Sequence, residues 1–562
     1  MPWQKRKVMF VVCRKLPGSS RSCILICQSV RDGKKVTQKT VKYYGVAHSE
    51  EQRLILVEQA RNEITKLIPP RPLTKKATSS EETLIDPCNG ALLGHMVERF
   101  RMVDGFHAIF EPIFDELNLA SLFTKIRYNQ LRDVVITRIA HPASKLHTAE
   151  LLKTTFLRPL SEDQIYRLMD EIVGFEDKIK SKVFETTQKL TLKQPADLLL
   201  FDVTTLYFES QKSDELREFG YSKDHKVGET QVVLALATTA TGSPIGYHLF
   251  KGNTAEVTTL LECLEKWKTI LDINNVIVVA DRAMMSEDNL KAMEDAKLNF
   301  IYVVAAKLKK LPKNLKEAVL CRKEESQVAF GDEMVSIQEH SHEGRRLIVQ
   351  YSEKRAQKDA KDRDRLIERI KKKLDKSNKT DTRKLVTNNG YLKFLAEEKK
   401  GEAVLNEQKV EEDKRWDGLH GVITNDKESK AVELLTRYRR LWVIEESFRI
   451  NKHNLSMRPI YHFTPDRIKA HILICYLAFA MTRYAQQKIN IFDDSISIEK
   501  MRESLGEVQS SILEDTTTGC FYKVPSRMGK EATMIYRAMG VKRGKGPDKC
   551  VMKQKCSVMK KT

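Results

Sequence analysis

The segment between residues 195 and 305 constrains the fold of this 562-residue chain more than any other feature, because its apolar runs are short and follow a definite order. β-rich runs bounded by turn residues come first, and runs with helical spacing then alternate with further β-rich runs. The expected elements are strands at 196–203, 231–239 and 245–250, a helix at 255–270, a strand at 276–280, a helix at 286–296 and a strand at 299–305. Three strands joined by hairpins and followed by a β-α-β alternation predict an α/β domain with a mixed sheet flanked by helices.

Two aspartates stand directly after apolar runs of this segment. Asp202 follows Leu198-Leu199-Leu200-Phe201, and Asp281 follows Val276-Ile277-Val278-Val279-Ala280. The order of elements matches a ribonuclease H-like core, in which the first strand is central and the fourth strand is its neighbour, so the two carboxylates are expected to face each other. A carboxylate on a central strand is costly unless it meets a cation. Considered singly, Asp202 or Asp281 could instead be a polar residue that only caps the end of its strand, and this alternative stays open.

A third acid lies in a segment with helical spacing. Tyr438, Glu445 and Lys452 recur together with residues three and four positions apart, so they are expected to share one helix face. Glu446 is rotated by about 100° from Glu445, and we therefore predict Glu445 as the functional acid. Alternatively, both glutamates are surface residues paired with the neighbouring arginines.

The three predicted ligands are carboxylates without a histidine or cysteine set nearby, which favours Mg²⁺ or Mn²⁺ over Zn²⁺. Two such ions a few ångströms apart can activate water and stabilise the leaving oxygen of a phosphodiester. The sequence therefore predicts two-metal chemistry on DNA, that is, cutting and joining of strands.

The composition agrees with a nucleic-acid partner. The net charge is +21, and an excess of this size favours polyanions because each neutralised phosphate releases counterions. A generically basic protein is the alternative. The longest apolar stretch, Ile472 to Met481, is too short to span a membrane, and the ten cysteines lack paired C-x-x-C spacing. We predict a cytoplasmic protein with reduced thiols.

Shifts in composition divide the chain into six regions. The first contains β-rich runs at Val8–Cys13, Ser22–Gln28 and Val36–Tyr44, followed by a helix at Glu50–Ile68. The expected regions are a small β-rich domain at 1–70, a helical, DNA-binding domain at 84–190, the first part of the ribonuclease H-like core at 195–305, an insertion domain at 306–430, the second part of the core at 431–490 and a C-terminal region with a basic tail at 491–562.

The helical region contains a candidate helix-turn-helix. One helix is expected at Leu146–Phe156, and Ser161-Glu162-Asp163-Gln164 has the form of a capping box that opens a second helix. Two helices across a short turn can place Tyr166 and Arg167 near a DNA groove. Ordinary packing in a helical bundle explains the same pattern, and both readings stay open.

The insertion is predicted where the β-α-β alternation breaks, after residue 305. A charged helix with an apolar stripe is expected at Glu353–Lys376, and helical spacing resumes from Val432 to Met481. The strand candidates of the insertion are Ser336–Gln338, Arg346–Tyr351, Tyr391–Leu395 and Leu419–Thr424.

The residues around Glu445 resemble the Y-R-E-K signature, Y-x2-R-x3-E-x6-K, of DDE transposases of the insertion-sequence-four type. Tyr438, Glu445 and Lys452 fall on its tyrosine, glutamate and lysine, whereas Leu441 stands at its arginine position and a neighbouring arginine such as Arg440 would have to replace it. Further segments resemble one subgroup of these transposases in the same order: Asp202–Glu209, Tyr221–Lys226, Lys251–Thr254, Asp281–Met284, Trp416–Gly418 and Arg458–His462.

The resemblance implies two Mg²⁺ ions, replaceable by Mn²⁺, held by Asp202, Asp281 and Glu445. It implies an enzyme that binds terminal inverted repeats, cleaves the element ends and joins the 3′-hydroxyl to target DNA, as a homodimer or higher oligomer on double-stranded DNA in the bacterial cytoplasm, near the nucleoid. The implied or candidate DNA contacts are Tyr438, Lys452, Arg440, Arg449, Lys223, His225 and Lys226. Trp442 is expected to be a buried anchor of its helix, the alternative being stacking on a flipped base.

Two other functions fit parts of the pattern. A ribonuclease H-like nuclease or resolvase would cleave without strand transfer, but the long insertion and the Y-R-E-K residues disfavour it. A DNA-binding protein derived from an inactive transposase would have lost at least one acid, and Asp202, Asp281 and Glu445 are all present.

Overall fold

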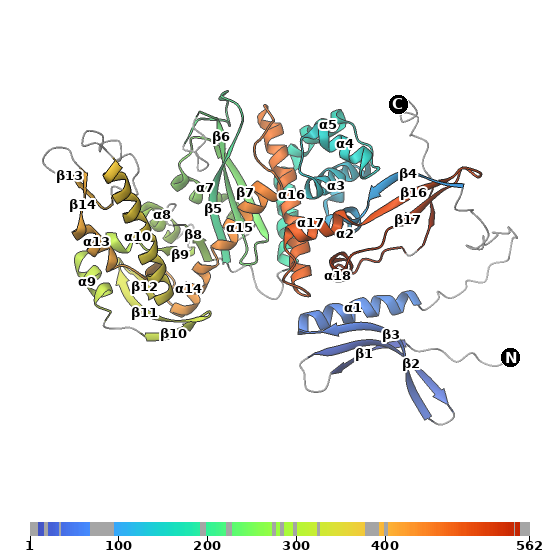
Figure 1. Cartoon of the computed structure of the whole chain (residues 1–562), viewed down its shortest axis with the longest axis horizontal. Coiled ribbons are helices and arrows are strands. Elements are labelled where there is room, and N and C mark those ends of the chain that lie inside the picture. Colours follow the sequence, from blue (N-terminus) through green and yellow to red (C-terminus); the bar gives the residue numbers. More distant parts are fainter. Residues whose placement is uncertain are drawn as a thin grey trace. The chain divides into compact units, whose positions relative to one another are not determined.

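The computed structural model of the chain divides into two compact units, which are considered separately. The first unit comprises residues 1–174, 454–456 and 470–562, and the second comprises 175–453 and 457–469 (Figure 1). The structure describes residues 9–15, 21–32, 35–67, 95–190, 198–220, 228–271, 277–281, 286–295, 300–322, 326–376, 393–397, 403–544 and 546–550.

A nine-stranded mixed sheet organises the second unit (Figure 1). Its strand order is β10-β11-β12-β15-β9-β8-β5-β6-β7. The strands of the predicted α/β segment are β5 (Leu198–Tyr207), β6 (Gln231–Thr238), β7 (Pro244–Lys251), β8 (Ile277–Ala280) and β9 (Ile301–Ala305). The hairpins β5-β6-β7 are antiparallel, while β8 pairs parallel with both β5 and β9. The predicted mixed sheet, with the first strand beside the fourth, is confirmed.

Alternate side chains of the central strands bury one face of this sheet. Leu199, Phe201 and Val203 of β5 join Val278 and Ala280 of β8 in one buried cluster. Side chains of three helices complete the same cluster. These helices are α6 (Glu176–Leu190), α7 (Glu256–Leu271) and α8 (Glu287–Glu294). Because side chains of a strand alternate between faces, the residues between these positions belong to the opposite face.

The segment between 306 and 430 enlarges this sheet. Its strands β10 (Ser326–Phe330), β11 (Glu333–His342), β12 (Arg345–Tyr351) and β15 (Leu419–Thr424) continue the sheet beyond β9 by antiparallel pairing. The charged helix α10 (Glu353–Lys376) occupies its predicted bounds. It contributes Ile370 to a small cluster of its own with Phe394, Leu395 and Val410. The predicted strands at 346–351 and 419–424 are confirmed, while a separate insertion domain stays a prediction.

Helical structure after residue 430 is interrupted, so the expectation of continuous helical structure from Val432 to Met481 is wrong. The elements are α14 (Ala431–Arg439), α15 (Trp442–Arg449), a π-helical turn (Ile450–Asn454) and α16 (Pro465–Asn490). The intervening residues from 455 to 464 form irregular structure with a cis Arg458–Pro459 bond. Proline cannot donate a backbone hydrogen bond, so a regular helix does not continue through Pro459.

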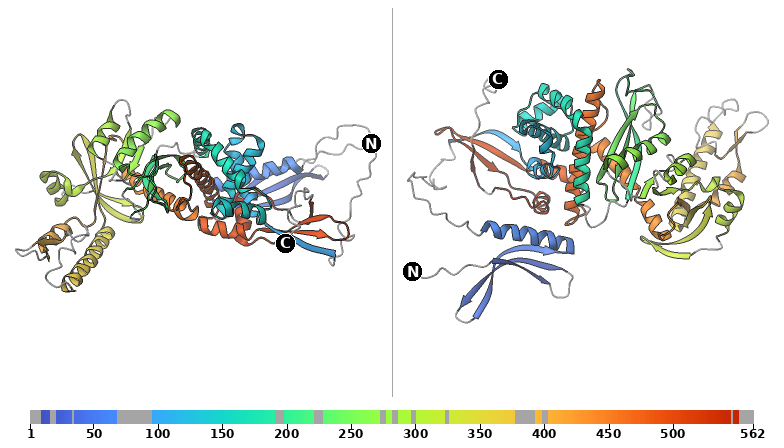
Figure 2. Two further views of the ribbon diagram at one scale, coloured as in Figure 1. Left: turned by 90° about the horizontal axis from the view of Figure 1, so that it is seen from above. Right: turned by 180° about the vertical axis from the view of Figure 1, so that it is seen from behind.

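The first unit begins with the predicted small antiparallel sheet. Its strands are β1 (Met9–Lys15), β2 (Ser22–Asp32) and β3 (Lys35–Ala47), followed by α1 (Glu50–Leu67). Helix α1 contacts all three strands, and Figures 1 and 2 show it lying along the sheet. Ile24 and Ile26 of β2 pack against Leu56 and Ala60 of α1, because both elements present one apolar face.

The remainder of the first unit joins segments that are far apart in the sequence. The expectation that 84–190 is helical throughout is wrong for β4 (Met96–Val103), which pairs with β16 (Gln509–Asp515). With β17 (Phe521–Pro525) and β18 (Asp548–Cys550) they form a four-stranded sheet. The other elements of this unit include α2 (Gly105–Glu116), α3 (Lys125–Ala140), α4 (Lys145–Thr154), α5 (Glu162–Ile172), α17 (Ile498–Gly506) and α18 (Lys530–Ala538).

The capping box predicted at the start of α5 is present. The Ser161 hydroxyl accepts from the backbone N–H of Gln164, and the Gln164 side chain accepts from the backbone N–H of Ser161. Helices α4 and α5 are consecutive and in contact, Arg167 is exposed and Tyr166 is half-buried. Their use in DNA reading stays a prediction.

In the described part of the chain, none of the helices is long and apolar enough to cross a membrane. The eight cysteines that the structure describes are all free thiols.

Gly252, in one of the segments singled out from the sequence, lies where a side chain does not fit. A Cβ atom on it would collide with the backbone oxygens of Gln231 and Glu218, and neither oxygen can move without disturbing β6. We therefore expect Gly252→Ala to lower the free energy of unfolding by about 1–3 kcal/mol, the usual cost of overpacking. Chemical denaturation of the variant checks this, with Gly174→Ala, at which a Cβ meets nothing within 4 Å, as the matched control.

Candidate active site

Asp202 and Asp281 are placed side by side by the parallel pairing of β5 and β8. Phe201 pairs with Ala280, so each aspartate immediately follows one member of this pair. Since Phe201 and Ala280 belong to the cluster under α6, α7 and α8, strand alternation carries both carboxylates to the opposite face. Asp202 is half-buried and Asp281 is exposed. The Asp202 carboxylate also accepts a 2.7 Å hydrogen bond from the backbone N–H of Val203.

Glu445 comes from α15, which packs on β5 and β6. This helix lies on the face of the sheet away from α7 (Figure 1). Val443, Ile444 and Phe448 form its buried side, and Glu445 is exposed beside them. Glu446 is partly buried, and its carboxylate lies 3.8 Å from the Arg449 guanidinium. The two glutamates thus have different surroundings, with Glu446 in an ion pair with Arg449, and the choice of Glu445 as the functional acid stays a prediction.

The three acids lie on neighbouring elements, but their oxygens are not drawn tightly together. Among the described residues, the set of three metal-ligating side chains whose ligand atoms lie within 4.8 Å of one another is His107, Glu111 and Asp133, in the first unit. Asp202, Asp281 and Glu445 do not form such a set.

Tyr438, Glu445 and Lys452 do not lie on one continuous helix, as their spacing predicted, but on α14, α15 and the π-helical turn. Between α14 and α15 the backbone tightens, with hydrogen bonds from Leu441 to Tyr438 and from Val443 to Arg440 that each close a three-residue turn. The Tyr438 ring lies 5.2 Å from that of His420. Lys452 lies in the π-helical turn and is partly buried.

The exposures of Leu441 and Trp442, where α15 begins, bear on two expectations from the sequence. Leu441, at the arginine position of the signature, is buried with 9% exposure, so it serves packing and cannot be replaced by a charged group without cost. Arg440 beside it is exposed. Trp442 is 57% exposed. The expectation that Trp442 is a buried anchor is wrong, because the tight turn before α15 directs Leu441 inward instead.

The chain returns to the end of β5 after the π-helical turn. Ile460 forms a parallel bridge with Phe208, and the Arg458 guanidinium lies 5.6 Å from the Tyr207 ring centroid. Tyr461 and Phe463, both more than half exposed, follow. Sequence reasoning singled out this segment as a motif but did not place it beside β5, since no local pattern encodes that contact.

A buried arginine supports the same end of the sheet and was missed from the sequence. The Arg217 guanidinium pairs with Asp214 at 2.7 Å and donates to the Phe463 carbonyl at 3.2 Å. It also lies 5.5 Å from the Phe208 ring centroid. Its signal in the sequence is weak, because a single arginine in a loop gives no spacing to recognise.

Two of the remaining motifs have different outcomes. Trp416-Asp417-Gly418 forms a structural turn in which Asp417 holds Arg363 of α10 by two hydrogen bonds of 2.5 and 2.6 Å, and Gly418 adopts a φ of +77°. Lys223, His225 and Lys226 lie outside the described residues.

Comparison with known proteins identifies a family for the region that contains these acids. The sequence profile of the family described as "Transposase DDE domain" matches residues 193–481. Among solved structures, the cryo-EM structure of a piggyBac transposase synaptic complex with hairpin DNA is similar, with 8% sequence identity and a TM-score of 0.35 over 72% of this chain and 77% of that chain. No curated protein matches the chain significantly.

Proposed function

The chain belongs to the transposase DDE domain family, and from this premise we propose that it is an insertion-sequence transposase that cleaves element ends and joins them to target DNA. The observation that carries the proposal is the placement of Asp202, within β5, beside Asp281, directly after β8, where the parallel pairing of these two strands ends. Glu445 lies on a helix packed against the first of these strands. All three residues fall within the matched region.

The donor chemistry fits divalent magnesium. Asp202, Asp281 and Glu445 offer only carboxylate oxygens, which hard cations prefer. Two ions held by them, when bound, would activate water and stabilise the leaving oxygen of the phosphodiester. Two separate ions do not require all three carboxylates to meet at one point, which agrees with their spacing on a ribonuclease H-like sheet. Mn²⁺ would be accepted by the same oxygens.

The residues around the acids would hold the DNA. Lys452 and Tyr438 would contact phosphate near the scissile bond, where a cation stabilises developing negative charge. Arg440 is exposed and would replace the arginine of the Y-R-E-K signature, while Arg449, also exposed, would contact the backbone. Lys223, His225 and Lys226 are proposed as further backbone contacts, and the net charge of +21 favours double-stranded DNA as the partner. We propose a homodimer or higher oligomer on DNA, acting in the bacterial cytoplasm.

The products of the reaction distinguish a transposase from a nuclease without strand transfer. The wild-type protein is incubated with Mg²⁺, labelled duplexes that carry the inverted repeats flanking its gene, and an unlabelled plasmid. A transposase releases 3′-hydroxyl ends at the repeat boundary and transfers the label to the plasmid. A nuclease or resolvase releases ends without transferring label, and a protein that only binds the repeats releases none; either result contradicts the proposal.

The exposed Trp442 gives a prediction about DNA contact. Trp442 precedes Glu445 by three positions in the sequence, and its exposed ring can stack on a DNA base. Such stacking is worth about 1–3 kcal/mol. Trp442→Ala is expected to weaken end cleavage by roughly 5- to 100-fold at limiting DNA, while Trp442→Phe retains part of the activity. Because the side chain is exposed, the thermal unfolding midpoint should stay unchanged. A large loss of stability with unaltered cleavage would instead indicate that Trp442 anchors the helix.

A further inference from the structure

We propose an anion-binding site in the first unit, in a cavity that binds a phosphate group. The cavity has a volume of about 270 Å³ and lies among α2, β16, β17 and α18. Its charged walls include four cations, Arg158, Lys523, Lys542 and Arg543, and three acids, Asp104, Glu111 and Asp548.

Arg543 supplies the strongest evidence for a ligand. Its side chain is 10% exposed, and one terminal amino group donates to the backbone oxygen of Gln509. The Nε and Nη1 atoms of the same guanidinium are buried without a hydrogen-bond partner among the described residues. Leaving buried donors unpaired is costly, and the guanidinium fork fits the oxygens of phosphate.

Two of the three acids in the wall are paired with cations of the same cavity. Asp104 accepts from the Ser510 hydroxyl at 2.6 Å and pairs with Lys523 at 2.9 Å, and its second oxygen lies 3.6 Å from Arg543. Glu111 pairs with Arg158 at 2.6 Å. An entering anion therefore meets two paired carboxylates, Asp104 and Glu111, and the unused donors of Arg543.

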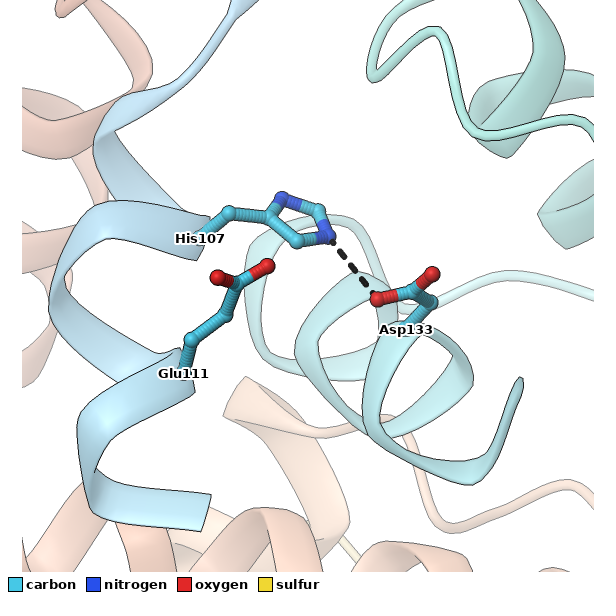
Figure 3. A group of neighbouring side chains, drawn as sticks. All are labelled: His107, Glu111 and Asp133. Atoms are coloured by element: carbon cyan, nitrogen blue, oxygen red, sulfur yellow. Dashed lines mark ion pairs between the residues drawn. The ribbon is translucent and has the colours of Figure 1, made fainter. Parts of the chain in front are cut away.

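The neighbouring group of His107, Glu111 and Asp133 fixes Arg158 and does not favour a cation (Figure 3). His107 Nε2 lies 3.7 Å from Asp133, but burial and the charges of Arg158 and Arg132 lower the pKa of His107 to about 2, so the imidazole is neutral. Arg132 and Arg158 both lie within 3.5 Å of Glu111 and of Asp133. Two guanidinium groups balance two carboxylates, so a divalent ion would add uncompensated charge and would have to displace the arginines.

Substitution of Arg543 tests this site. Binding of a labelled 20-bp duplex of arbitrary sequence is measured at several salt concentrations for wild type, Arg543→Gln and Arg543→Lys. If the site takes DNA backbone phosphate, Arg543→Gln weakens binding about 10-fold and lowers the salt slope by about 1, and the lysine variant recovers part of the affinity. Exposed Arg527 lies outside the cavity, and Arg527→Gln is the matched control.

A second measurement separates DNA from a free anion and guards against misfolding. Thermal unfolding of the same variants is recorded in inorganic phosphate and in chloride at equal ionic strength. A phosphate-specific rise in midpoint for wild type but not for Arg543→Gln, with unchanged duplex binding, assigns the site to a free anion. If neither duplex binding nor phosphate stabilisation depends on Arg543 in a folded variant, the site does not exist. The inference is independent of catalysis, because an inactive protein can still show both effects.

Discussion

Replacement of Asp202, Asp281 or Glu445 by alanine is expected to abolish cleavage at the element ends. Each carboxylate would hold the ions that stabilise charge in the transition state, and loss of one such group costs on the order of 1,000-fold or more in rate. The measurement is the initial rate of strand cleavage with Mg²⁺ on labelled duplexes. Because Asp281 and Glu445 are exposed and Asp202 is half-buried, the variants should fold and should still bind the inverted repeats.

Glu446→Ala is the matched control for this series. Glu446 lies next to Glu445 on α15 but pairs with Arg449, so its removal should change the cleavage rate by less than about 10-fold, as expected for a partly exposed ion pair worth about 1 kcal/mol. An equal loss of activity in Glu446→Ala and Glu445→Ala would show that the choice between the two glutamates is wrong. Retention of normal activity in Asp202→Ala would exclude the whole site.

The second large effect is on stability and comes from a buried lysine. Lys145 in α4 is fully buried, and its amino group lies 3.3 Å from His471 Nδ1, whose Nε2 faces the Cys475 thiol at 3.8 Å. Burial, helped by the charge of Arg138, lowers the pKa of Lys145 from 10.5 to about 7. Since one pKa unit corresponds to about 1.4 kcal/mol, this burial costs on the order of 5 kcal/mol at neutral pH.

The sign of the pH dependence follows from proton binding. Between pH 7 and 10.5 the unfolded chain holds the Lys145 proton and the folded protein does not. The free-energy cost of burying Lys145 therefore falls as the pH rises through this range, and it is at its full value below pH 7. Lys145→Met should therefore raise the thermal unfolding midpoint by several degrees at pH 7, with a gain that shrinks toward pH 9. Loss of the hydrogen bond between Lys145 and His471 would reduce the gain by about 1 kcal/mol.

Exposed Lys153 of the same helix provides the control for Lys145. Lys153→Met should leave the midpoint nearly unchanged at every pH, because an exposed lysine has no burial cost to remove. A constant difference between Lys145→Met and wild type from pH 7 to 9 would contradict a lysine with a lowered pKa.

Local patterns predicted most of the sheet that carries Asp202 and Asp281. The strands that carry Asp202 and precede Asp281 were recognisable because burial on both faces gives a short continuous apolar run, and helix α10 was recognisable because burial on one side gives an apolar stripe. The alternation of Leu199, Phe201 and Val203 then fixes the face on which Asp202 lies. Such short-range signals are strong where one strand is buried between two layers.

Long-range pairing was not predictable in the same way. Met96–Val103 reads as part of a helical region, yet it forms a strand because its partner is Gln509–Asp515, more than 400 residues away. Similarly, Trp442 was assigned to the interior because tryptophan is usually buried, whereas the three-residue turns before it bury Leu441 and expose the indole. Contacts of this kind depend on tertiary structure and leave no spacing in the sequence.

A metal-specific rescue tests the central claim most directly, namely that Asp202 holds a divalent ion that cuts DNA. Asp202→Cys replaces a hard oxygen by a soft sulfur, which binds Mg²⁺ poorly and accepts Mn²⁺ more readily. We predict that this variant shows almost no cleavage at the element ends with Mg²⁺ and recovers cleavage at the same bonds with Mn²⁺, while Asp202→Ala stays inactive with both ions. Two results would contradict a metal ligand at this position. In the first, Asp202→Cys cleaves equally well with Mg²⁺ and with Mn²⁺. In the second, Asp202→Cys is inactive with both ions while Asp202→Ala is fully active.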